Sequence, residues 1–186
     1  MSTTRLYFVR HGRAAAGWDA ELDPGLDELG HQQAREMADQ LAPLGPMSVI
    51  TSPFLRCQQT AVPLCEAWNS KPEISPEVGE IPSPEGVPKS DRVAWLRKTM
   101  GGTWLSLGPR YTIFRDEVVN FIRQINSDTV IFSHFMAINA VIGRTQDDDR
   151  LVLFRLDNCS ITSVELGTNG NLKLIQSGRE ADTLIR

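Results

Sequence analysis

Three short, largely apolar runs punctuate the chain, and each stops abruptly at polar residues. The runs cover residues 6–9, 47–51 and 129–132. Runs of this length are typical of strands that are buried on both faces of a sheet. Stretches with apolar side chains at helical spacing separate them, and strands that alternate with helices predict βαβ units. We therefore expect an α/β fold with three layers, α/β/α, and a mostly parallel central sheet.

The segments between these runs carry signals for helices and turns. Apolar spacing predicts helices over residues 28–41, 54–68, 91–100, 111–125 and 136–142. Asp27 is placed to cap the first helix, and Pro63 is expected to bend or shorten the second. Five prolines predict an irregular loop over residues 72–90. Residues 160–166 and 172–176, joined by a Gly-Thr-Asn-Gly turn, are predicted to form a hairpin.

Length and composition narrow the class of protein. The chain has 186 residues, 41% hydrophobic and 23% charged, which fits one domain spanning residues 1–186. A net charge of -4 argues against a protein that coats nucleic acid. No apolar run approaches the ~20 residues that span a bilayer, and the first residues do not resemble a signal peptide. We expect a cytoplasmic protein with no nucleic-acid or membrane partner, and a homodimer would be compatible with the sequence.

The cysteines and one histidine carry no sign of a metal or cofactor site. Cys57, Cys65 and Cys159 form no CxxC pair and no Cys/His ligand spacing, so buried thiols in a reducing compartment are expected. His31 stands beside two glutamines in a predicted helix and is expected at the surface. The sequence therefore predicts no metal and no cofactor.

The residues that can carry chemistry follow the predicted strands. The strand endings are Arg10-His11-Gly12, Ser52-Pro53 and Ser133-His134. Arg56 lies one turn into the helix that follows the second strand. Ligands of parallel sheets bind at the carboxyl ends of the strands, so two imidazoles and two guanidiniums should converge there. Such a cluster of cations requires an anion among them, and the planar fork of arginine suits a phosphoryl group.

In this order and at these spacings, the residues resemble the histidine phosphatase superfamily, also called phosphoglycerate mutase-like. The resemblance covers most of the chain. It rests on Phe-Val-Arg-His-Gly at 8–12, Asp-Pro-Gly-Leu-Asp-Glu-Leu-Gly at 23–30, Thr-Ser-Pro-Phe-Leu-Arg-Cys-Gln-Gln-Thr at 51–60, Glu-Ile at 80–81 with Glu-Gly at 85–86, Phe-Ser-His at 132–134 and Asn-Cys-Ser-Ile-Thr at 158–162. It implies a phosphoglycerate mutase-like fold.

The resemblance implies a role for each matching residue. His11 would be the nucleophile that takes the phosphoryl group on a ring nitrogen, forming a phosphohistidine. Arg10, Arg56 and His134 would hold the nonbridging oxygens and offset charge in the transition state. His134 would thereby belong to both the catalytic and the phosphate-binding groups.

Three further residues have more than one interpretation. Glu80 resembles the proton donor to the leaving oxygen, a role that needs a raised pKa, which burial under a loop would supply. Glu85 is its nearby rival for that role. Asn158 matches a position near the phosphate pocket, and an alternative is that its side chain caps the turn into the hairpin.

The chain departs from the family pattern in two places and carries one distinctive insert. Arg13 follows the Arg-His-Gly motif where the family often has an acidic residue, so it adds charge at the pocket mouth or is solvated. Phe135 stands where glycine usually follows the second histidine, and its ring is expected to narrow the site. The insert at 80–109 is expected to form a cap. Trp95 and Trp104 within it either line the pocket or pack the insert onto the domain.

The resulting hypothesis is a metal-independent phosphomonoester hydrolase that acts on a small phosphorylated metabolite through a phosphohistidine. Four competing functions stay open. They are a phosphohistidine-protein phosphatase, phosphoglycerate mutase-type phosphotransfer, a noncatalytic phospholigand-binding module, and a metallohydrolase that uses His11, His134 and the aspartates at 147–149.

Overall fold

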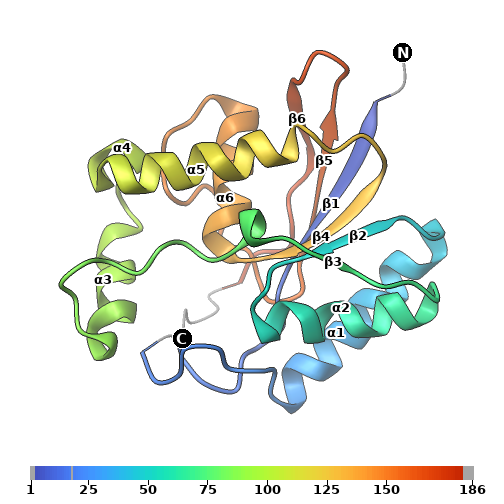
Figure 1. Cartoon of the computed structure of the whole chain (residues 1–186), viewed down its shortest axis with the longest axis horizontal. Coiled ribbons are helices and arrows are strands. Elements are labelled where there is room, and N and C mark those ends of the chain that lie inside the picture. Colours follow the sequence, from blue (N-terminus) through green and yellow to red (C-terminus); the bar gives the residue numbers. More distant parts are fainter. Residues whose placement is uncertain (1–2, 18, 182–186) are drawn as a thin grey trace.

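The computed structural model describes residues 3–17 and 19–181. Within them a six-stranded sheet has the order β3-β2-β4-β1-β5-β6 (Figure 1). The strands are β1 (Thr4–Arg10), β2 (Ser48–Thr51), β3 (Glu73–Ile74), β4 (Thr129–Ser133), β5 (Ile161–Leu166) and β6 (Leu172–Gln176). Strands β1 to β4 pair with one another in parallel. Strand β5 pairs antiparallel with β1 on one side and with β6 on the other. The expectation of a mostly parallel sheet is confirmed, as is the hairpin.

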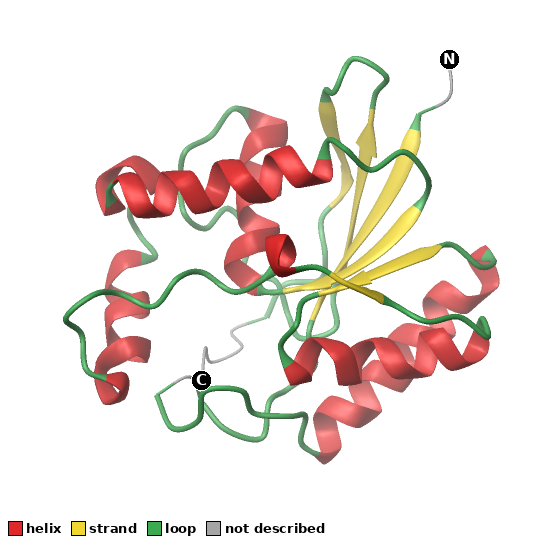
Figure 2. Cartoon of the chain, in the orientation of Figure 1, coloured by secondary structure: helices red, strands yellow, loops and turns green. Residues whose placement is uncertain are grey.

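Helices cover both faces of the sheet (Figure 2). Helices α1 (Glu28–Leu41) and α2 (Leu55–Ala67) pack together on one face, and α5 (Pro109–Ile122) and α6 (Phe135–Gln146) pack on the other. Neighbouring side chains of β1 alternate between these layers, because Phe8 belongs to the core under α5 and α6 and Val9 to the core under α1 and α2. The short apolar runs are therefore strands buried on both faces, and the three-layer α/β/α architecture is confirmed.

The shorter elements lie in the connections. They are η1 (Ala42–Leu44), η2 (Pro76–Val78), η3 (Lys89–Asp91), α3 (Arg92–Thr99) and α4 (Trp104–Leu107). Together with their loops, η3, α3 and α4 fill most of the 80–109 segment, which runs outside the sheet between β3 and α5 (Figure 1). Trp104 is fully buried, so it packs the segment onto the domain. Trp95 is half-buried and lies 5.6 Å from Tyr111, ring centre to ring centre.

The local signals for helix α1 act as predicted, and one for α2 does not. The side chain of Asp27 accepts a hydrogen bond from the Gly30 N–H at 2.8 Å, which caps α1. Helix α2 continues through Pro63 to Ala67, so of the two expected effects of Pro63, bending or shortening, the shortening does not occur. At its start the Leu55 N–H donates to Asp23 Oδ1 at 2.7 Å, a cap supplied from a distant part of the chain.

Strand β3 and helix α4 are absent from the sequence-based prediction, and helix α6 is longer than predicted. Strand β3 has two residues inside the proline-rich segment and exists through its pairing with β2. Helix α4 is a single turn closed by a capping box at Thr103. Helix α6 runs past residue 142 to Gln146 and ends at Asp147 in the left-handed conformation. These features depend on pairing or capping, which hydrophobic periodicity does not record.

The cysteines and His31 lie where the sequence predicts them. The three cysteines are free and buried, and His31 is exposed. None of the helices within the described residues combines the length and the apolar composition that a membrane crossing requires.

Candidate active site

The parallel register of three strands brings the predicted residues to one edge of the sheet. Arg10 is paired with Ser133 across β1 and β4, and Thr51 with Phe132 across β2 and β4. Hydrogen bonds continue one residue further, from His11 N–H to the Ser133 carbonyl at 3.1 Å and from Ser52 N–H to the Phe132 carbonyl at 3.0 Å. The residues that follow β1 and β2 are thus held against β4. The His11 and His134 ring centres lie 5.3 Å apart, so the predicted convergence of the two imidazoles is confirmed.

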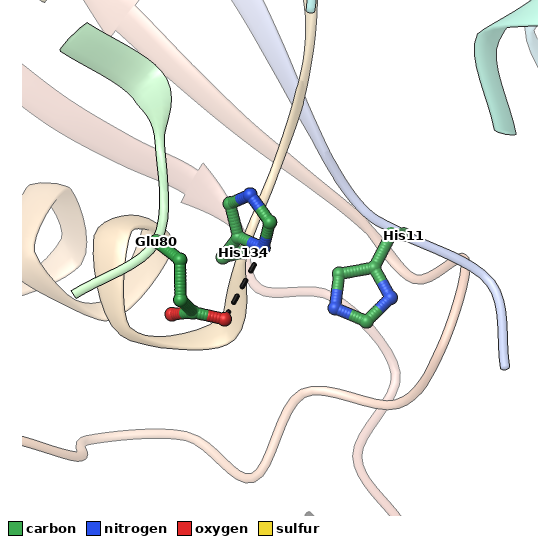
Figure 3. A group of neighbouring side chains, drawn as sticks. All are labelled: His11, Glu80 and His134. Carbon is green, nitrogen blue, oxygen red and sulfur yellow. Dashed lines mark ion pairs between the residues drawn. The ribbon is translucent and has the colours of Figure 1, made fainter. Parts of the chain in front are cut away.

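His11 is buried and its ring has one defined orientation. Its Nδ1 lies 2.8 Å from the Gly12 carbonyl, which can only accept, so Nδ1 carries the proton. The other ring nitrogen, Nε2, faces Glu80 and His134 (Figure 3). Burial, and then the neighbouring Arg56, His134 and Arg10, lower the pKa of His11 well below its usual value of 6.5. At neutral pH His11 therefore presents a lone pair on Nε2.

Two backbone contacts fix the segment that carries His11. The Asn158 side-chain amide donates to the His11 carbonyl at 2.9 Å, and the Gly12 N–H donates to Thr60 Oγ1 at 3.0 Å. Asn158 thus lies at the site, and this hydrogen bond of its side chain fixes the strand end that carries His11. Gly12 itself must be glycine, because an added Cβ would lie 2.7 Å from the Gly30 carbonyl oxygen.

His134 is completely buried, and its partners determine which nitrogen is protonated. Its Nδ1 lies 3.2 Å from Glu80 Oε2 and also 3.2 Å from Arg56 Nη2, and we assign the Nδ1 proton to the bond with the carboxylate oxygen, which can only accept. Its Nε2 lies 2.7 Å from Ser52 Oγ, which also accepts the Phe54 N–H at 3.3 Å. The Ser52 hydroxyl can therefore donate to Nε2. Burial lowers the pKa of His134, and Glu80 offsets this only in part, so the ring is neutral at neutral pH.

Glu80 forms an ion pair with Arg56, Nη2 to Oε2 at 3.3 Å, on the same oxygen that accepts from His134. Burial alone would raise the pKa of Glu80, but His134 and Arg56 outweigh it and hold that pKa well below 4.5. The expectation of a raised pKa is therefore wrong for the site without substrate. The carboxylate is ionised in that state and itself lies between the Arg56 and His134 side chains.

Each of the two arginines of the cluster stands against a phenylalanine. The Arg10 guanidinium carbon lies 5.1 Å from the centre of the Phe135 ring, and Arg10 Nη1 donates to the Leu156 carbonyl at 2.6 Å. The Arg56 guanidinium carbon lies 4.7 Å from the centre of the Phe54 ring. Burial lowers the pKa of Arg10 to about 10, which leaves it charged at neutral pH.

Several predicted candidates lie elsewhere. Glu85 is 85% exposed in its side chain and pairs with Arg110, so it is not within the buried cluster. Arg13 pairs with Asp27 at 2.5 Å, at the start of α1. The aspartates at 147–149 face arginines outside the site: Asp147 pairs with Arg144, Asp148 with Arg150 and Asp149 with Arg115. The metallohydrolase hypothesis built on those aspartates is therefore wrong in its choice of ligands.

The sequence analysis did not predict the side chains that contact the site residues. Ser52, Phe54 and Thr60 all lie within the segment that carries the resemblance, yet no role was expected for them. A signal did exist for Ser52, because it directly follows β2, as His11 and His134 follow β1 and β4. The contribution of the Leu156 carbonyl has no sequence signal, since every residue has one.

A different set of residues offers metal ligands. One ligand atom from each of His11, Glu80 and His134 lies within 4.8 Å of the others. However, Arg56 Nη2 lies 3.3 Å from Glu80 and 3.2 Å from His134 Nδ1, so a dication would sit against a buried guanidinium. The donor set fits an anion better than a metal ion.

Comparisons with known proteins identify a family and a shared fold. The histidine phosphatase superfamily (branch 1) matches residues 6–176. An Erwinia tasmaniensis protein described as "Probable phosphoglycerate mutase GpmB" is 27% identical, over 87% of this chain and 84% of its own length. PE-PGRS family protein PE_PGRS11 of Mycobacterium tuberculosis is 39% identical over 80 residues, which are 40% of this chain and only 14% of that protein. The structure of mycobacterial glucosyl-3-phosphoglycerate phosphatase with VO3 has a TM-score of 0.73 at 21% identity, covering 92% of this chain and 96% of that one, and so shares the fold.

Proposed function

Because the chain belongs to the histidine phosphatase superfamily, branch 1, we propose that it hydrolyses a small phosphate monoester through a phosphohistidine on His11, without a metal. One observation carries this proposal. A neutral imidazole has its Nδ1 proton held by the Gly12 carbonyl, and its Nε2 faces Glu80 and His134 (Figure 3). Arg56 belongs to the same cluster, since its Nη2 lies 3.2 Å from His134 Nδ1. That is the arrangement of a nucleophile aimed at an anion.

In the first step the Nε2 lone pair of His11 attacks phosphorus. The N–P bond forms, the P–O ester bond breaks, and the bonding electrons leave with the ester oxygen, which takes a proton from Glu80. Arg10, Arg56 and the Nδ1–H of His134 donate to the three nonbridging oxygens as charge moves onto them. In the second step water attacks phosphorus, its proton returns to Glu80, and the N–P bond breaks to release inorganic phosphate.

Glu80 must take up a proton when the substrate binds, either from solvent water or from the monoanionic form of the phosphate ester. In the site without substrate its carboxylate pairs with Arg56 and His134. An incoming phosphoryl group competes for the same donors and adds negative charge beside Glu80. Both effects raise the pKa of Glu80, because its cationic partners turn to the substrate and a like charge approaches. Substrate binding therefore converts Glu80 from an internal counterion into an acid.

Under this proposal the 80–109 segment determines the substrate specificity. It carries Glu80 at one end and packs through Trp104 on the core, so it can act as a cap over the reacting group. Because the same segment carries Glu80, a substrate that fits the cap also places its leaving oxygen next to the proton donor. We assign the substrate to the class of small phosphorylated metabolites.

A second candidate function is phosphoglycerate mutase-type transfer, which the description of the Erwinia relative favours. A mutase returns the phosphoryl group from His11 to a bound intermediate instead of water. Hydrolysis is the preferred proposal, because the solved structure that shares the fold is described as a phosphatase.

The deciding experiment measures p-nitrophenyl phosphate hydrolysis by the wild type and by His11→Ala, each with and without EDTA. Acid-sensitive, base-stable labelling by a radioactive phosphate ester is followed in parallel. Activity and label that resist EDTA and vanish in His11→Ala support the proposal. Activity abolished by EDTA and restored by a divalent cation indicates a metallohydrolase, and binding without turnover of any ester indicates a noncatalytic module. Transfer between phosphoglycerates identifies a mutase, and release of phosphate from a phosphohistidine protein alone identifies a phosphohistidine-protein phosphatase.

A further inference from the structure

The residue after the second site histidine departs from the family pattern, and the structure shows where its side chain goes. Phe135 is the first residue of α6 and is 7% exposed. Its ring lies against Arg10, with the guanidinium carbon 5.1 Å from the ring centre. It therefore contacts a group expected to bind phosphate, instead of merely narrowing the pocket.

Arg10 is in an environment where such a contact matters. Its side chain is 5% exposed, so most of the hydration of its charge has been removed. The Leu156 carbonyl accepts one of its N–H groups at 2.6 Å. An aromatic face carries partial negative charge, and its attraction for a cation grows when both are desolvated. A ring at this position attracts the guanidinium and restricts its rotation.

We propose that Phe135 is a positioning residue that holds Arg10 through a cation–π contact, so that the guanidinium keeps one orientation toward the phosphoryl oxygens. This inference rests on the proposed function, in which Arg10 binds the phosphoryl group. Phe135 does not touch the reacting atoms and acts only through Arg10.

The same arrangement occurs at the second arginine. The Phe54 ring lies 4.7 Å from the Arg56 guanidinium carbon and meets the His134 ring edge to face at 5.2 Å. Two phenylalanines from different elements thus stand against the two arginines of one site. Phe135 is the better one to test, because a change at Phe54 disturbs a histidine as well as an arginine.

The test weakens the π face without changing the shape of the side chain. Phe135 is replaced site-specifically by mono-, di- and trifluorinated phenylalanine, and the dissociation constant of inorganic phosphate is measured by calorimetry. Affinity should fall stepwise with fluorination, and Phe135→Leu should lose about 3- to 30-fold. Fluorination at Phe114, whose ring lies 6.0 Å from that of Trp104, is the matched control and should leave affinity unchanged.

The same series is then repeated in an Arg10→Met background. There fluorination at position 135 should have no effect, because the cation is gone. Should Phe135→Leu fail to fold, the fluorinated proteins, which keep the shape of the side chain, still decide the question. If all the fluorinated variants at position 135 that retain Arg10 bind phosphate equally well, the inference is overturned. Undiminished phosphate affinity in Arg10→Met itself overturns the proposed role of Arg10, which is a failure of the proposed function and not of the contact.

Discussion

At the scale of single residues, the site is a buried cluster of cations and neutral imidazoles with one carboxylate among them. Burying charge is costly unless it is paired, and Glu80 supplies the pairing for Arg56. The imidazoles respond to the same environment by staying neutral. One carboxylate therefore serves both the resting site and, under the proposed mechanism, the chemical step.

Glu80→Gln should separate these two roles. The amide keeps the shape but cannot give a proton, so hydrolysis of alkyl phosphates should fall about 10²- to 10⁴-fold. Hydrolysis of p-nitrophenyl phosphate, whose leaving group needs little protonation, should fall by less than about tenfold. Steady-state kinetics with both esters decides the matter, and Glu85→Gln serves as the exposed control. Equal losses on the two esters would assign Glu80 to binding alone.

Ser52→Ala should disturb the protonation pattern of His134. Without the hydroxyl donor on Nε2, the ring is no longer held in its Nδ1–H form, and kcat should fall roughly tenfold, in line with the loss of one buried hydrogen bond. Nitrogen NMR of the His134 ring reports the change in tautomer, and Ser52→Thr should restore it. Ser48→Ala, an exposed position on the same strand, is the control. An unchanged His134 spectrum in Ser52→Ala would refute this assignment.

At the scale of elements, the site depends on how three strand ends and the starts of their helices are held. Helix α6 begins directly after His134, and α1 begins after the loop that follows His11. Asp27 connects helix α1 to the site. Its side chain caps α1 and also pairs with Arg13, which lies two residues after His11. The same side chain thus serves helix stability and loop placement.

Asp27→Ala should lower the free energy of unfolding by about 1–2 kcal/mol, through the lost cap and the partly exposed ion pair. Urea denaturation measures the change, and Asp39→Ala, an exposed acidic residue of the same helix, should change stability by less than about 0.5 kcal/mol. Similar losses in both variants would mean that general helix charge, and not the cap, is responsible.

At the scale of the whole molecule, the buried groups make stability depend on pH. The folded pKa values of His11 and His134 lie below 6.5, and that of Glu80 lies below 4.5. Below pH 6.5 the unfolded chain binds protons at both histidines while the folded protein does not, so acidification favours unfolding. Glu80 acts in the same direction, because its paired carboxylate stabilises the fold above 4.5 and this contribution is lost as the pH falls further.

We therefore expect the free energy of unfolding to fall steadily from about pH 7 to pH 4. The His11→Ala variant should lose less stability than the wild type between about pH 7 and pH 5, since one depressed pKa is gone. Urea titrations of the wild type and of His11→Ala at several pH values measure this difference. A wild-type slope in His11→Ala would show that His11 is not held neutral by the fold.

The architecture and the strand ends that form the site could be predicted from the sequence. Strand periodicity and the residues at strand ends are local properties, and parallel strands must bring their carboxyl ends together, so Arg10, His11 and His134 could be placed from the chain alone. Arg56, one turn into the helix after the second strand, follows from the same argument, and the motif segments added Glu80. The structure brings both to the same cluster.

Only the tertiary structure decided how those residues are held and charged. The choice between Glu80 and Glu85 as a member of the cluster depends on burial, which spacing does not encode. The ionised state of Glu80 and the Phe135 ring against Arg10 depend on distances between residues far apart in sequence. Charge and orientation are set by three-dimensional surroundings, because desolvation and Coulomb energy vary with position in space and not with position along the chain.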